Sequence, residues 1–162
     1  MKKFFTLCLV VLTAVTTAKA QLEVGGIVGG LNGASVKYWF NDKMALQGDL
    51  AVGLTQAAFN GGSMGLWDFT VNPNFLYHFD IISDLKVYTG GGVNLGMAGG
   101  IGGSGVVGKF GVKAVAGLAY EIPSAPIVLA FDFRPGYGML FNTAYGGSFF
   151  DWNLALAVRY KL

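Results

Sequence analysis

Charged residues are scarce in this sequence of 162 residues, where Asp, Glu, Lys and Arg together make up only 12%. A soluble domain usually carries about 25% charged residues, so an ordinary soluble enzyme is not expected. Long apolar runs are missing outside the first 20 residues, which excludes a helical membrane protein although the mean hydropathy is +0.53. The aromatic content of 14% excludes a disordered chain, and the 26 glycines follow no three-residue period, which excludes collagen.

The one cysteine, Cys8, lies in a segment with the pattern of a secretory signal peptide. Two lysines precede an apolar run at residues 4–15, and the sequence Ala-Lys-Ala at 18–20 supplies a cleavage site. The run is too short for a transmembrane helix, which needs about 20 apolar residues. We therefore predict a signal peptide at 1–20 and one mature domain at 21–162, without a thiol, a disulfide or a cysteine metal site.

Removal of the signal peptide takes away three of the eleven basic residues and leaves all nine acidic ones, so the net charge becomes about −1. The remaining basic residues form no cluster in the sequence, and a nucleic acid is not expected as a partner.

Large apolar residues alternate with small or polar ones along most of the mature sequence. In the clearest stretch, 152–162, Trp, Leu, Leu, Val, Tyr and Leu alternate with Asn, Ala, Ala, Arg and Lys. This period of two excludes helices, whose apolar positions recur every three or four residues. Pro73 removes one ladder hydrogen bond and predicts a bulge or a local irregularity. The predicted strands lie at 22–30, 34–40, 44–53, 67–79, 85–95, 109–121, 127–136 and 149–162.

The predicted connections alternate between two kinds. Short ones lie near 30–33 and at 41–43, 80–84 and 122–126, and longer ones rich in Gly, Ala, Ser and Asn lie at 54–66, 96–108 and 137–148. Apart from the first connection, short turns therefore gather at one end and longer loops at the other, which predicts an up-and-down meander. An even number of strands places both termini at the end with the short turns.

The two faces of the predicted strands differ in the size of their side chains. One face carries Trp, Phe, Tyr, Leu and Val, and the other is mostly Gly, Ala, Ser, Thr and Asn with single charges. The small set fits the narrow interior of an eight-stranded barrel, and the large set fits a lipid-facing exterior. We therefore predict an all-β, eight-stranded antiparallel up-and-down transmembrane barrel, with a soluble lipocalin-like barrel as the alternative. The aromatic residues predicted at the membrane interfaces are Trp39, Trp67, Trp152 and Tyr160.

The signal peptide, the eight alternating strands and the terminal segment Trp152–Leu162 resemble the small outer-membrane barrels of the OmpA/OmpX type. The resemblance covers the whole mature sequence and implies the bacterial outer membrane, its lipid as surroundings and periplasmic termini. It also implies that the terminal strand is recognised by the barrel-assembly machinery, although Leu162 stands where the family usually ends in an aromatic residue. The sequence stops at the barrel, so the peptidoglycan-binding role of the OmpA subgroup does not carry over.

Charged residues on the inward face predict a polar network that fills the lumen, because buried charges persist only when they are paired and hydrogen-bonded. Asp68 and Lys161 share this inward phase. The predicted members of the network are Glu23, Lys37, Asp49, Lys86, Lys113, Glu121, Asp132, Arg134 and Arg159. A gated ion or proton path through the same residues is the alternative interpretation.

Hairpin geometry predicts which of these charges meet. Lys37 and Asp49 come within diagonal reach across the 41–43 turn, and closure of the last strand onto the first brings Glu23 near Arg159 or Lys161. In the same way, Asp132 and Arg134 share one face of their strand, with Lys113 on the adjacent strand.

His78 is the only histidine and the natural candidate for catalysis. It is predicted to lie near the periplasmic rim, facing Lys86 across the next hairpin, with no serine or acid placed to form a triad. Residues 103–109 have the spacing of a phosphate-binding loop, but Phe110 stands where Ser or Thr is needed, and a strand follows. We interpret that segment as a surface loop, and we expect no catalytic residue, cofactor or metal ion.

The sequence therefore predicts a non-enzymatic outer-membrane barrel with a filled lumen and no open pore, acting in envelope integrity or surface interaction. A surface partner would bind the loops at 54–66, 96–108 and 137–148, where Phe59, Met64, Met139, Phe141 and Tyr145 stand among small residues. The alternatives are a lipid A-modifying outer-membrane enzyme and an OmpW-like narrow transporter of small apolar molecules.

Overall fold

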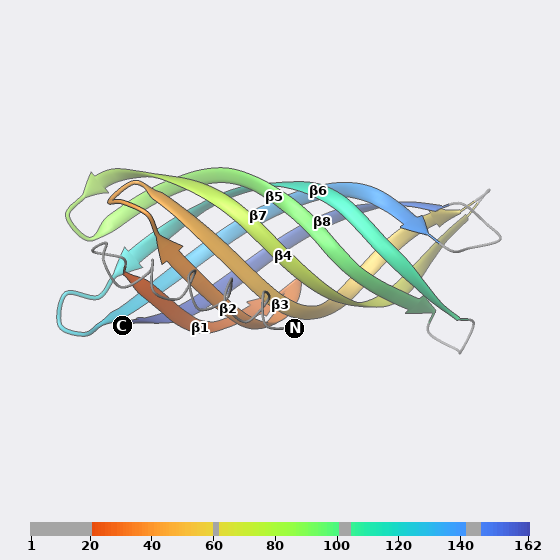
Figure 1. The fold of residues 1–162 in the computed structure, drawn as a ribbon, viewed down its shortest axis with the longest axis horizontal. Coiled ribbons are helices and arrows are strands. Elements are labelled where there is room, and N and C mark those ends of the chain that lie inside the picture. The colour runs from red at the N-terminus through yellow and green to blue at the C-terminus, as the bar shows by residue number, and fades with distance from the viewer. Residues whose placement is uncertain (1–20, 60–61, 101–104, 142–146) are drawn as a thin grey trace, which may run out of the picture.

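Eight antiparallel strands close into a barrel in the computed structural model, which describes residues 21–59, 62–100, 105–141 and 147–162 (Figure 1). The signal peptide predicted at 1–20 lies outside the described residues. The described part contains no helix long and apolar enough to span a bilayer. The strands are β1 (Leu22–Gly29), β2 (Leu31–Trp39), β3 (Met44–Phe59), β4 (Gly62–Ile82), β5 (Leu85–Gly100), β6 (Val106–Glu121), β7 (Ile127–Phe141) and β8 (Gly147–Lys161).

Each strand pairs with its neighbours in sequence, and β1 pairs with β8 to complete the ring. The C-terminus lies at the end that carries the turns 40–43, 83–84 and 122–126, here called the turn end (Figure 1). The opposite end, where β3, β5 and β7 finish, is called the loop end. The prediction of an eight-stranded up-and-down barrel is confirmed.

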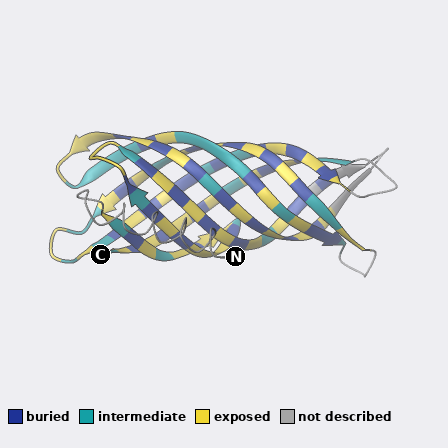
Figure 2. Ribbon diagram, viewed as in Figure 1, coloured by how far each residue is buried: buried dark blue, intermediate teal, exposed yellow. Residues whose placement is uncertain are grey.

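The period of two in the sequence becomes an alternation of buried and exposed residues along the strands (Figure 2). In β8, Leu156 and Val158 are more than half exposed on the outer surface, whereas Ala155, Ala157 and Arg159 are buried inside. A similar division holds around the barrel: most large apolar residues face outward, and small or charged residues predominate inside, together with a few large apolar ones such as Tyr88 and Phe149. This arrangement is the one predicted for a transmembrane barrel rather than a lipocalin-like one.

The predicted loops at 54–66, 96–108 and 137–148 are wrong over most of their length, because the strands continue through them. β3 and β4 remain paired as far as Phe59↔Gly62, and β5 and β6 as far as Gly99↔Val106. Glycine and alanine give little apolar alternation, yet their backbones pair like those of any other residue. The length of the strands in these segments therefore could not be predicted from the pattern of side-chain hydrophobicity.

The first hairpin is tighter and shorter than predicted, because β1 and β2 are joined through Gly30 alone and Leu31 already pairs with Gly53. Gly29 has a φ of 128°, a value that favours glycine, and the Asn32 side chain bonds both its N–H and its carbonyl.

Beyond this hairpin β3 pairs directly with β8, at Ala57↔Phe149 and Ala58↔Ser148. The wall therefore has eight strands near the turn end but only six near the loop end.

Two prolines interrupt the ladders without shifting their register. Pairing between β4 and β5 is absent at Asn72 and Pro73, and pairing between β6 and β7 is absent at Arg134 and Pro135. The irregularity predicted at Pro73 is thus a missing ladder step, and the register shift of β4 lies instead between Asp80 and Ile82.

Candidate functional site: the charged interior

The interior contains ten buried charged residues among those the structure describes. Five are acidic and five are basic, so their formal charges cancel when all are ionised. They lie in three groups along the barrel, named here the loop-end, central and turn-end groups. The acids are Glu23, Asp49, Asp68, Asp132 and Asp151, and the bases are Lys37, Lys109, Lys113, Arg134 and Arg159.

Lys109 is the centre of the loop-end group. Its Nζ lies 2.5 Å from Asp68 Oδ2 and 3.0 Å from Asp151 Oδ2, and it also donates to the Thr55 hydroxyl. The Thr55 hydroxyl in turn donates to Asp68 at 2.7 Å. Strands β3, β4, β6 and β8 are thereby tied together across the lumen.

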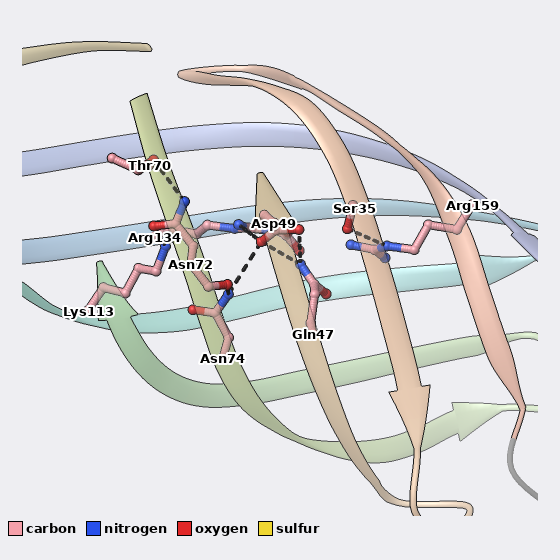
Figure 3. A network of polar contacts seen from close by, with 10 residues as sticks. Ser35, Gln47, Asp49, Thr70, Asn72, Asn74, Lys113, Arg134 and Arg159 are labelled. Carbon is pink, nitrogen blue, oxygen red and sulfur yellow. Dashed lines mark hydrogen bonds and ion pairs between the residues drawn. The ribbon is translucent and has the colours of Figure 1, made fainter. Parts of the chain in front are cut away.

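Arg134 is the centre of the central group (Figure 3). One terminal nitrogen lies 2.6 Å from Asp49 Oδ2, and the other bonds Asp132 on its own strand. Gln47 and Asn74 donate further hydrogen bonds to Asp49, at 3.1 and 3.3 Å. Because both carboxylates and the guanidinium are excluded from water, the group is stable only as a complete set.

Lys113 borders the central group without joining its ion pairs. Its Nζ donates to Asn72 Oδ1 at 2.6 Å, and Asn72 donates to the Thr70 hydroxyl at 2.9 Å (Figure 3). The described residues place no carboxylate within ion-pair distance of this lysine.

The turn-end group combines charges with aromatic rings. Lys37 Nζ lies 3.4 Å from His78 Nε2 and 4.6 Å from the centroid of the Tyr88 ring. The His78 ring is sandwiched between Trp39 and Tyr88, with centroid distances of 4.2 and 4.9 Å. Trp39 Nε1 donates to Glu23 Oε1 at 2.7 Å.

Arg159 also belongs to the turn-end group, and it crosses from β8 to β2. Its Nε donates to the Ser35 hydroxyl at 3.0 Å (Figure 3). Gly25 of β1 stands between these two residues in the sheet, since it pairs with both. A Cβ at Gly25 would lie 1.9 Å from the Val158 carbonyl oxygen and 2.7 Å from the Arg159 Cα, so the close approach of the β8 backbone requires glycine here.

A rim cluster, Lys86, Glu121 and Lys161, lies at the turn end. Lys86 Nζ is 3.1 Å from Glu121 Oε1, and Lys161 pairs with the other carboxylate oxygen. These side chains are about one fifth to one quarter exposed, so the cluster is at the water boundary rather than inside.

Apolar side chains share the interior with the charged groups. Around Lys109 of the loop-end group, Phe149 packs with Leu66, Leu140, Ala57 and Ala98. A second cluster includes Tyr88, which also contacts Lys37 and His78 of the turn-end group. Its members are Ile27, Leu76, Tyr88, Val115, Ala119, Val128, Ala130, Ala155 and Ala157. In the described part of the chain, charged and apolar side chains therefore occupy the lumen together.

The structure brings some predicted partners together and separates others. Asp132 and Arg134 share a face and bond each other, with Lys113 facing the same interior. Glu23 pairs in register with Lys37 and Lys161, as the closure of the barrel requires, but its side-chain hydrogen bond goes to Trp39. Asp49 lies one diagonal step from Lys37, but its ion pair is with Arg134.

Two predictions about aromatic residues turn out differently. Trp67, Trp152 and Tyr160 are 41%, 67% and 52% exposed on the outer surface, whereas Trp39 is only 7% exposed and points inward. The prediction of Trp39 as an interface residue is wrong, because Trp39 shares the inward phase of Lys37 two residues earlier. His78 lies near the turn end, where its backbone N–H donates to the Lys43 carbonyl, but its ring is buried against Lys37, Trp39 and Tyr88 rather than facing Lys86.

Several interior residues were missed, chiefly Lys109, Asp151, Thr55 and the amide side chains of the central group. Lys109 was predicted as the last residue of the phosphate-loop spacing at 103–109 and as the first residue of the strand at 109–121, and its inward phase was not followed. Residues 103 and 104 of that spacing lie outside the described part. From Val106 onward the segment is β6, and Lys109 has the same phase as Lys113. That phase is the signal that would have identified it.

The charged groups do not form a metal site among the described residues, since no set of three or more His, Cys, Asp or Glu side chains is placed to hold an ion. The contacts of His78 are Lys37, Trp39 and Tyr88, and none of these is a carboxylate or a serine.

Comparison with known proteins identifies the fold. No family model matches the sequence, and no curated protein matches it. Among solved structures, Neisserial surface protein A is 19% identical, with 88% of this chain and 94% of that one covered and a TM-score of 0.60. The N-terminal barrel domain of Pseudomonas aeruginosa OprF is 18% identical, with 88% of this chain and 96% of that one covered and a TM-score of 0.53.

The Escherichia coli outer membrane protein W is 13% identical, with 88% of this chain and 97% of that one covered and a TM-score of 0.51. At these identities the likeness shows the fold alone. That fold is the small eight-stranded barrel of outer-membrane proteins, as the resemblance to the OmpA/OmpX type predicted.

Proposed function

We propose that this protein is a bacterial outer-membrane barrel with a structural role and a closed lumen. The observation that carries the proposal is the inverted distribution of side chains. Leu154, Leu156 and Val158 are more than half exposed on the outer wall, whereas ten charged residues are buried inside. Such a wall is suited to hydrocarbon, where a closed barrel also leaves no unpaired strand edge.

The same proposal includes the route to the membrane and the orientation in it. The segment 1–20 directs export and is removed, the turn end faces the periplasm, and the lipid of the outer membrane surrounds the wall. The strand Trp152–Leu162 is the signal for the barrel-assembly machinery. In its support, the last residues of β8 are the ones that pair with β1, at Glu23↔Lys161 and Val24↔Tyr160.

The cellular role that we propose is envelope integrity or contact with a surface partner at the loop end. The alternative of an OmpW-like transporter of apolar molecules is disfavoured by the interior, where Arg134 and Lys109 each contact two carboxylates. The alternative of a lipid A-modifying enzyme lacks a nucleophile and an acid beside His78 in the described part of the chain.

Electrophoresis of the detergent-refolded protein, boiled and unboiled, tests the membrane barrel. A closed ladder has no edge from which to unravel, so we expect the unboiled sample to resist SDS and to migrate differently from the boiled one. Identical migration, together with solubility in the absence of detergent, would overturn the proposal.

The mass of lipid A from cells that express the protein tests the absence of an activity on that lipid. We expect no change in mass with the wild-type protein. A change that is abolished by His78→Ala but retained in the surface variant Trp152→Phe would establish the enzymatic alternative instead.

A further inference from the structure

The wall between β6 and β7 contains a backbone carbonyl that has lost its ladder partner. Pairing runs to Lys113↔Gly136 and resumes at Ala116↔Phe133 in the same register, so Ala114 stands opposite Pro135. Proline carries no N–H and cannot donate across the ladder. Which carbonyl is affected depends on the direction in which these backbone groups point.

The surroundings of the nearby glycines give that direction. A Cβ at Gly111 would lie 2.8 Å from the Tyr137 carbonyl oxygen, and one at Gly136 would lie 3.3 Å from that of Val112. Tyr137 on β7 and Val112 on β6 therefore direct their carbonyls toward each other's strand. Backbone groups that point to one side recur at every second residue, so the Pro135 nitrogen faces the Ala114 carbonyl. Because proline has no N–H, this oxygen lacks the ladder hydrogen bond that the β7 strand would otherwise donate to it.

A groove of about 280 Å³ lies at this break. It opens on the outer wall, because the side chains of Val112, Tyr137 and Phe150 are each 45% to 58% exposed there. Ala114, Pro135 and Gly136 also line it and have little or no side chain to fill it. The groove, which Lys113 also lines, therefore combines mostly apolar walls with the Ala114 carbonyl as a hydrogen-bond acceptor.

We propose that the groove binds a hydroxylated acyl chain of a membrane lipid, whose hydroxyl group donates to the Ala114 carbonyl. This proposal rests on the membrane location proposed above. An unpaired carbonyl in hydrocarbon is costly, and a hydroxyl group on an acyl chain is a donor that lipid itself can bring to that depth. A water molecule is a poorer occupant of a mostly apolar groove that faces hydrocarbon, because a bound water needs two to four polar partners.

The test is a titration of the refolded, ¹³C-labelled protein in detergent micelles with 3-hydroxymyristic acid and, separately, with myristic acid. The Ala114 carbonyl ¹³C resonance is followed by NMR. We expect the hydroxylated acid to shift this resonance with an apparent Kd about fivefold lower than that of myristic acid, the gain of one hydrogen bond. Equal affinities, or a shift with neither acid, would overturn the proposal.

Pro135→Ala is the decisive variant, because it gives the ladder an N–H for the Ala114 carbonyl. We expect this variant to bind the two acids equally. Pro73→Ala is the matched control, because Pro73 interrupts the β4–β5 ladder in the same way, and it should retain the fivefold preference. A preference that survives Pro135→Ala would contradict the assignment.

Ala114→Leu provides a second variant, because the exposed position 114 lies in the groove and a larger side chain would fill it. We expect it to weaken the binding of both acids, and unchanged binding would place the ligand elsewhere. The difference between boiled and unboiled samples is checked for every variant. If the boiled and unboiled wild-type protein migrate identically, the proposed membrane barrel is refuted. If they migrate differently but the protein binds 3-hydroxymyristic acid and myristic acid equally, only the proposed lipid site in the groove is refuted.

Discussion

Single side chains inside the barrel differ in how fully their charges are compensated. Arg134 contacts two carboxylates, whereas Lys113 and Arg159 contact neutral groups, an amide oxygen and a hydroxyl. Loss of a fully compensated charge leaves its partners buried without compensation, which costs more than the pair itself contributes. Single substitutions and combined substitutions should therefore behave very differently at these positions.

Arg134→Met should lower the free energy of unfolding by about 3–5 kcal/mol, because it leaves Asp49 and Asp132 buried without their cation. The triple variant with Asp49→Asn and Asp132→Asn should recover most of that loss, since no charge then remains. Urea unfolding in lipid vesicles, followed by tryptophan fluorescence, measures both. A triple variant no more stable than the single one would contradict this account of the central group.

Glu121→Gln in the rim cluster is the contrasting case. The carboxylate is about one quarter exposed, so water already screens its pairs with Lys86 and Lys161. We expect the substitution to lower the free energy of unfolding by less than about 1 kcal/mol, and by less still in 1 M NaCl, as measured by the same unfolding assay. A large loss that does not depend on salt would show that the cluster is shielded from solvent.

Trp39→Phe tests the inward position of this side chain. The indole N–H is the donor to Glu23, whose other oxygen has no partner among the described residues. Removal of this N–H donor should lower the free energy of unfolding by about 1–3 kcal/mol. Trp152→Phe on the outer wall should change stability by about 0.5 kcal/mol or less. Equal effects of the two substitutions would argue that Trp39 faces outward.

The contacts of single side chains could be predicted from the sequence only where the inward or outward phase of a strand decides them. The inward phase identifies Lys37 and Arg134 as interior residues, and it would also have placed Trp39 inside had it been applied consistently. The pair between Arg134 and Asp49 joins residues 85 apart in sequence and spans the lumen. Such a contact depends on the tilt and stagger of the strands, which the sequence alone does not specify.

Between neighbouring strands, glycine makes room for large side chains. A Cβ at Gly117 would lie 2.5 Å from Tyr88 Cζ, and one at Gly138 would lie 2.6 Å from Phe149 Cζ. On the outer wall, Trp67 lies across Gly99 in the same manner. A glycine and a large side chain on adjacent strands thus form a unit of packing, and this explains how a narrow interior holds Tyr88 and Phe149.

Gly99→Val tests this unit, because the nearest atoms that its Cβ would meet, at 2.5 to 2.6 Å, all belong to the Trp67 ring. In the wild-type background the substitution should lower the free energy of unfolding by about 1–3 kcal/mol. In the Trp67→Ala background the same substitution should lower it by much less. Gly48→Ala is the control, since a Cβ there meets nothing within 4 Å, and it should be neutral or slightly stabilising. Additive losses in the double variant would refute the coupling.

Strand number and order could be predicted because eight stretches carry the period of two. Strand length could not, since the ends of β3, β5 and β7 are built from Gly, Ala and small residues. The direct pairing of β3 with β8 was equally hidden, because it follows from the short β1–β2 hairpin and not from any local pattern.

For the whole molecule, the equal number of buried acids and bases among the described residues means that these charges can balance one another without a mobile counter-ion. Two apolar clusters, around Phe149 and around Tyr88, share the interior with the charged groups. We expect vesicles that contain the protein to hold a KCl gradient as long as protein-free vesicles do. Steady single-channel currents in a planar bilayer would contradict this expectation and favour a gated ion path.

The change from eight strands to six also gives the molecule a taper. The diameter of a barrel grows with the number of its strands, so the wall is narrower toward the loop end than toward the turn end. In a bilayer such a wedge displaces less lipid from one leaflet than from the other. Crowded copies would then relieve packing pressure on the leaflet at the loop end and favour a membrane that curves toward the narrow end.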